Sequence, residues 1–180
     1  MASLRFGLDA IASLIALATA VAAWRSATEA RKATEQTRRG VQASIVSALM
    51  DQHSSGKTLA AHELLRQWVD THGDDFAAEF KRLRDLKSTD IGSVDAARRR
   101  LAHYLRKVHR LQYYKLLDED LIEAVMPRAT AEFCLDFIEP LEAAVRSNYE
   151  KDTFAWAASR FNLPRSHLLT SGPGPSDGAV

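Results

Sequence analysis

Apolar residues run almost without interruption near the start of the chain. Residues 6–24 carry a single charge, Asp9, and consist mainly of Ala, Leu, Ile and Val. About 20 such residues cross a bilayer as one helix. Asp9 near one end can lie among lipid headgroups, and Trp24 marks the opposite interface. This pattern predicts a transmembrane helix over residues 6–24, preceded by a short flank, residues 1–5.

The segment after this apolar run has a different composition. Residues 25–40 contain no Val, Ile, Leu, Met or aromatic residue and are rich in Ala, Glu, Lys, Arg and Gln. These residues are strong helix formers, and Glu35 lies four residues from both Arg31 and Arg39, a spacing that supports a helix. We therefore predict a solvated, charged helical stalk that continues the membrane helix as far as Gly40.

Apolar residues return at spacings of three and four in residues 41–168, separated by polar turns and prolines. No run alternates apolar and polar residues long enough for a strand. The pattern predicts an all-α fold, an antiparallel bundle of about five or six helices. We expect a break at 53–56, a longest helix from the Ser93 cap to about Leu117, and an interruption at Pro140. Residues 169–180 are rich in Gly, Pro and Ser and are predicted to be disordered.

Two alternatives remain for the first apolar run. Ala18-Thr19-Ala20 and Ala20-Val21-Ala22 both have the small-x-small form that signal peptidase accepts, so cleavage would release an exported helical domain. The weakly charged leader, which contains only Arg5 before Asp9, argues against this alternative. The other alternative is a buried helix of a soluble protein. We favour the retained span.

Basic residues flank the predicted span unequally. Arg5 precedes it, whereas five basic residues follow it closely: Arg25, Arg31, Lys32, Arg38 and Arg39. Because basic residues concentrate on the cytoplasmic side, the sequence predicts a single-pass protein of the inner or plasma membrane. Its N-terminus would lie outside and its C-terminal domain in the cytoplasm.

The composition limits the classes of function. A length of 180 residues suits one domain with appendages, and 24 basic against 23 acidic residues give a net charge of +1, so no global field attracts nucleic acid. The one cysteine, Cys134, lies in an apolar stretch, where it is expected to be a small buried residue rather than a disulfide partner.

No motif for catalysis, metal binding or nucleotide binding is complete. Ser55-Gly56-Lys57-Thr58 matches the end of a phosphate-binding loop, but Asp51 stands where the first glycine is required. His62-Glu63 lacks the second histidine of a zinc motif. The cluster of Asp70, His72, Asp74 and Asp75 is typical of helix ends. We predict no catalytic, cofactor-binding or metal-binding residues and no cofactor.

The longest predicted helix carries a basic stripe. At 100° per residue, Arg99, His103, Arg106 and Arg110 fall within about 60° of one another, with Leu101, Leu105, Val108 and Leu111 on the other side. Three interpretations compete: a solvated face or one paired within the fold, contact with the anionic cytoplasmic leaflet, and nucleic-acid binding aided by the Tyr113-Tyr114 pair. The nucleic-acid interpretation is the weakest, because the protein is nearly neutral.

The layout resembles a loosely defined group of bacterial and phage-associated membrane proteins of unknown function. The resemblance rests on the span LDAIASLIALATAVAAW, the following ARKATEQTRR, and RKVHRLQYYKLLDEDLIEAV leading into FCLDFIEPLEAAV. Members have one N-terminal span, a charged juxtamembrane helix and a helical cytosolic domain. The resemblance implies no activity and assigns no functional residue.

These patterns together favour a membrane-tethered, non-enzymatic interaction or adaptor protein, whose helical domain engages another protein or a second copy of itself. The alternative from another class is an enzyme with a site of dispersed carboxylates and histidines. A pocket with converging titratable groups would favour the enzyme, and an exposed apolar patch would favour the adaptor.

Overall fold

The computed structural model describes residues 2–165, with side chains described from residue 17 onward. Within this range the chain contains helices and no strand, which confirms the all-α prediction. The chain divides into two compact units, residues 1–44 and residues 45–180. We call the first the N-terminal unit and the second the helical body. The predicted disorder of residues 169–180 lies outside the described residues.

The N-terminal unit consists of the first part of α1 (Ala2–Ser54). Side chains 25–41 are exposed, with Thr28 partly so, as expected for a solvated helix. The Arg39 guanidinium lies 3.1 Å from the Glu35 carboxylate, one of the pairs predicted from spacing. The helix does not end at Gly40, where the stalk was expected to stop, but continues to Ser54.

No helix among the described residues is long and apolar enough to cross a membrane. The predicted transmembrane helix over residues 6–24 is therefore not supported by the structure. Side chains 6–16 of that segment lie outside the described part of the chain, and the described helix from residue 25 onward carries the charged stalk composition.

As far as residue 165, the helical body contains the last turns of α1 and seven further α-helices. One of these, α5, is a single turn, and α6 and α7 are two parts of one interrupted helix. This count agrees with the predicted five or six helices. The bounds are α2 (Gly56–His72), α3 (Phe76–Asp85), α4 (Gly92–Tyr113), α5 (Ile122–Val125), α6 (Arg128–Phe133), α7 (Glu139–Val145) and α8 (Lys151–Phe161).

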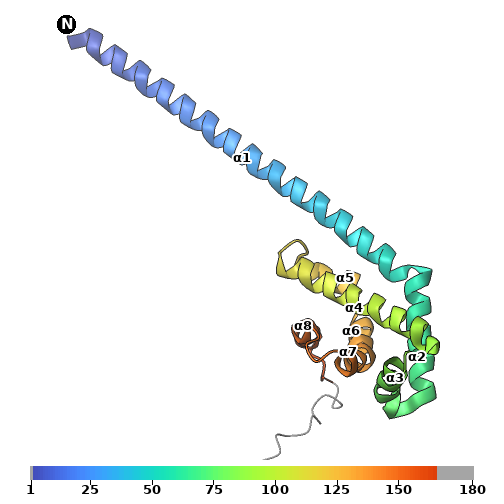
Figure 1. The fold of residues 1–180 in the computed structure, drawn as a ribbon. Coiled ribbons are helices and arrows are strands. Elements are labelled where there is room, and N and C mark those ends of the chain that lie inside the picture. The colour runs from blue at the N-terminus through green and yellow to red at the C-terminus, as the bar shows by residue number, and fades with distance from the viewer. Residues whose placement is uncertain (1, 166–180) are drawn as a thin grey trace, which may run out of the picture. The chain divides into compact units, whose positions relative to one another are not determined.

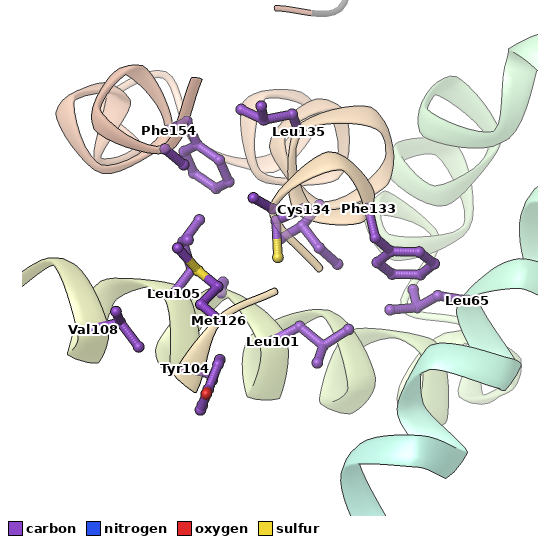
Figure 2. Packing of buried hydrophobic residues seen from close by; sticks show 14 of the residues in the cluster. Leu65, Leu101, Tyr104, Leu105, Val108, Met126, Phe133, Cys134, Leu135 and Phe154 are labelled. Atoms are coloured by element: carbon purple, nitrogen blue, oxygen red, sulfur yellow. The ribbon is translucent and has the colours of Figure 1, made fainter. Parts of the chain in front are cut away.

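The core of the body lies around α4, which packs against α2 and α8 (Figure 1). Figure 2 shows Leu101 and Leu105 of α4 facing Met126 and Cys134. All four side chains are at most 1% exposed. Burying such side chains contributes roughly 1.5–3 kcal/mol each. The core therefore fixes which face of α4 remains outside.

The predicted break before residue 56 is a single bend at Ser55, which caps α2. The Ser55 hydroxyl oxygen accepts a hydrogen bond from the Thr58 backbone N–H at 3.3 Å. The Thr58 side chain is buried and donates to the Gln52 carbonyl at 2.8 Å. The stretch that resembles a phosphate-binding loop is thus a helix N-cap. Its threonine hydroxyl already donates a hydrogen bond within the protein.

Pro140 interrupts its helix as predicted. A proline removes one backbone N–H and its ring clashes with the carbonyl four residues earlier. The chain accommodates this with a π-helical turn, Cys134–Ile138, and Pro140 then lies in the first turn of α7. One continuous helix becomes α6, a wide turn and α7.

Both predicted ends of α4 need correction. Ser93 lies inside the first turn, and the N-cap is Ile91, which makes no side-chain cap hydrogen bond. The helix ends at Tyr113 rather than near Leu117, because Lys115 adopts a left-handed conformation (φ 57°). Leu117 is still buried, although it lies in a non-helical turn after α4.

Candidate interaction surface on α4

The predicted basic stripe lies on the outer face of α4. Arg99, His103 and Arg110 are exposed and Arg106 is partly exposed, whereas the opposite side of the helix is buried. The prediction that this helix is amphipathic is therefore confirmed. Whether the stripe binds an anionic surface depends on how much of its charge is neutralised inside the fold.

The positive charge nearest the start of α4 is neutralised by carboxylates, chiefly that of Asp95. The Arg99 guanidinium lies 3.0 Å from the Asp95 carboxylate, and that of Arg98 lies 2.7 Å from it. Arg98 also pairs with Glu142 of α7, and its side chain is 1% exposed. Arg98, which is not part of the predicted stripe, is a core residue. Its position three residues before Leu101, on the apolar side of the helix, was the signal that could have shown this.

The middle of the stripe is only partly neutralised. Arg106 and Arg110 both reach the carboxylate of Glu150, at 2.8 and 3.2 Å. Lys107 donates a hydrogen bond of 3.2 Å to the side-chain oxygen of Gln52, a neutral group. One carboxylate thus serves two guanidinium groups, and Lys107 next to them has no ion-pair partner among residues 2–165.

These side chains line an open groove of about 300 Å³ on the body. No acidic side chain of the described residues is among those that line it. The lining combines cations with an apolar and an aromatic residue: His103, Arg106, Lys107, Arg110, Leu111 and Tyr114. Such a groove suits an anionic group with apolar neighbours.

Exposed apolar side chains gather where α4 ends. Tyr113 is 70% exposed, Tyr114 67% and Leu116 47%. The two tyrosine rings meet edge to face with centroids 5.2 Å apart. We call the groove together with Tyr113, Lys115 and Leu116 the α4 surface. The stripe predicted from the sequence missed Lys107, Lys115 and Leu116, although the Tyr113-Tyr114 pair was noted.

A second group of titratable residues surrounds the buried carboxylate of Glu139. The Glu139 side chain is fully buried, pairs with Arg165 and accepts a hydrogen bond from the Tyr149 hydroxyl at 3.1 Å. Burial, followed by the nearby negative charge of Glu139, raises the pKa of Tyr149 to about 12. Arg165, which is exposed, thus supplies the opposite charge that the buried Glu139 carboxylate requires.

Two histidines face aromatic rings inside the body. His53 stacks on Tyr104 with centroids 5.6 Å apart, and His62 lies 4.5 Å from the ring of Phe133. Desolvation lowers the pKa of His62 to about 4, with the positive charge of Arg66 and His53 adding to the effect. At neutral pH these histidines are uncharged packing groups. Within the described residues no three side chains of the metal-binding types lie close enough to hold a metal ion. This includes the cluster around Asp70.

Comparisons with known proteins identify no relative. No protein-family model matches the chain, and neither a curated protein nor a solved structure shows significant similarity to it.

Proposed function

We propose that this chain is a membrane-tethered interaction protein without catalytic activity. Residues 6–24 would anchor it, the charged part of α1 would link the anchor to the body, and the helical body would engage another protein or a second copy. The distribution of basic residues on either side of 6–24 favours a cytoplasmic body.

The observation that carries the tether is an exposed apolar side of α1. Leu17, Val21 and Trp24 are 63%, 43% and 70% exposed, and their spacing of four and three places them along one side of the helix. Large apolar side chains gain about 25 cal/mol for each Å² removed from water. The apolar sequence continues from Leu17 back to residue 6, so a bilayer would cover all of it.

The distribution of ionisable groups supports interaction rather than catalysis. An enzyme needs acids, bases or nucleophiles that converge on an open cavity. Here Glu139 and Glu142 are buried in ion pairs with arginines, and His62 lies against aromatic rings. The exposed apolar side chains of the body support binding instead, because such groups gain free energy when a partner covers them.

Membrane fractionation with a carbonate wash tests the tether. We expect the full chain to resist extraction, to keep its intact mass, and to carry a protease-accessible C-terminal tag in inverted vesicles. Leu17→Lys should release it, since a charge near the middle of a span costs about 2.5–3.5 kcal/mol. The matched variant Gln36→Lys, with the same added charge in the stalk, should stay in the membrane. Extraction of the wild type, or a product shortened near Ala20 or Ala22, would contradict the tether.

Cross-linking in intact membranes tests the interaction. We expect discrete products of higher mass than the single chain after treatment with a lysine-reactive reagent. A chain that stays monomeric at every reagent concentration would contradict an interaction function while leaving the tether in place.

A further inference from the structure

The α4 surface carries an excess of positive charge. Four cations belong to it, Arg106, Lys107, Arg110 and Lys115, against the one carboxylate of Glu150, which leaves three positive charges. Lys115 is exposed and has no ion-pair partner among the described residues. Since the whole protein has a net charge of only +1, this excess is local.

Apolar side chains adjoin these cations rather than lying elsewhere. Tyr114 lines the groove together with Lys107 and Arg110, and its ring contacts Tyr113. Leu116 follows one residue beyond Lys115 and is about half exposed. Tyrosine rings have an apolar body and a polar end, and they favour the headgroup level of a bilayer, where lysine and arginine can reach lipid phosphates.

We infer that the α4 surface docks on the headgroup region of an anionic membrane, with Lys107, Arg110 and Lys115 near lipid phosphates and Tyr113, Tyr114 and Leu116 at the acyl boundary. This inference rests on the proposed tether, which would hold the body within reach of a bilayer and so make a weak contact sufficient. It places the contact nearer the end of α4 than the predicted stripe did, because Asp95 neutralises Arg99.

The side chains favour lipid over nucleic acid. A nucleic acid could use the cations and stack bases on the tyrosines. Leu116 offers no face for stacking, but it gains free energy by leaving water for the acyl boundary. The cations of the α4 surface therefore suit lipid headgroups, and its tyrosines and leucine suit the acyl boundary.

A fluorescent label at the end of α4 tests docking in the full chain. Leu116→Cys can be labelled selectively with an environment-sensitive fluorophore, because the native Cys134 is buried. The labelled chain is reconstituted into vesicles of phosphatidylcholine alone or with three-tenths phosphatidylglycerol, each containing nitroxide lipids. We expect the nitroxides to quench the label in the anionic vesicles only, and high salt to relieve the quenching.

Two matched triple variants assign the contact to its residues. K107Q/R110Q/K115Q should lower the ratio of docked to undocked body about a hundredfold, given the roughly 1 kcal/mol that each basic residue contributes near an anionic surface. K57Q/K81Q/R100Q removes the same charge from exposed positions outside the α4 surface and should dock like the wild type. Equal helicity by circular dichroism shows that both variants remain folded.

The outcomes separate docking from the tether. A chain that floats with neutral vesicles while its label stays in water in anionic vesicles overturns docking and leaves the tether intact. Equal quenching in neutral and anionic vesicles, or equal quenching of the two triple variants, also overturns docking. A chain that fails to float with either kind of vesicle overturns the tether as well.

Discussion

Arg98 of α4 and Glu142 of α7 form an ion pair whose side chains are 1% and 4% exposed. The two residues are 44 positions apart, so the pair joins distant parts of the body. Asp95 supplies a second carboxylate to the same guanidinium at 2.7 Å. Each buried charge is tolerable because the other is present.

Removing Arg98 should therefore destabilise the body strongly. In Arg98→Met the buried Glu142 carboxylate keeps only its 3.9 Å pair with Arg146, and we expect a loss of about 3–5 kcal/mol in the free energy of unfolding. Arg99→Met, which breaks only an exposed pair with Asp95, should cost less than about 1 kcal/mol. Denaturant unfolding of the full chain in detergent measures both. If R98M/E142L is no more stable than Arg98→Met, the buried carboxylate is not the cause.

The stability of the body should fall as the pH drops from 6.5 towards 4. Burial lowers the pKa of His62 to about 4, and that of His53 is also lowered by burial. The unfolded chain takes up these protons near pH 6.5, whereas the folded chain resists them, so acid favours unfolding in this window. Titration of the acidic side chains also changes the free energy of unfolding with pH. The contribution of one histidine is therefore measured as the difference between the wild type and a variant.

His62→Gln should flatten this part of the pH profile relative to the wild type. The control is His103→Gln, an exposed histidine on α4. Free energies of unfolding measured at several values between pH 4 and 7 give the slopes. Identical slopes for wild type and His62→Gln would contradict the assignment.

Cys134 should be unreactive in the folded protein. Its side chain is 1% exposed, and burial raises the pKa of the thiol to about 12, so almost no reactive thiolate exists at neutral pH. Iodoacetamide at pH 8 should leave the native chain unmodified by mass spectrometry and modify it fully in denaturant. An introduced cysteine at exposed Leu116 should react quickly under native conditions. Comparable native rates at both positions would contradict the buried placement.

Gly40→Ala should stabilise α1. Gly40 lies inside the helix, and a Cβ added there meets nothing within 4 Å. Alanine is favoured over glycine in a helix by about 1 kcal/mol. Hydrogen exchange around residue 40 should slow accordingly. The same change at Gly73, whose φ is +55°, should destabilise the protein instead, because alanine is strained in that conformation.

Apolar spacing was sufficient to predict most elements of the body, but not their irregular ends. The break before α2, the long helix α4 and the interruption at Pro140 all lie where the pattern indicated. The end of α4 was placed too late, because Leu117 continues the apolar pattern while Lys115 reverses the backbone. A left-handed lysine has no signature in sequence.

The candidate surface was predicted only in part for a related reason. Helical geometry places Arg106 and Arg110 outside, but it cannot show that Glu150 neutralises part of their charge, since that contact joins residues about 40 positions apart. Nor can it show that the guanidinium of Arg98 pairs in the core with Glu142 of α7. Both depend on tertiary partners that spacing along one helix does not contain.

The π-helical turn Cys134–Ile138 sets which side of α7 faces the core. Glu142 lies nine positions after Phe133, and nine steps of 100° in an uninterrupted α-helix would put them on opposite sides. A π-turn adds about one residue to the winding and so delays the phase by nearly a third of a rotation. Phe133 and Glu142 are consequently both buried, at 5% and 3% exposure. One proline thus lets an aromatic ring and an ion-pairing carboxylate share a single core-facing side.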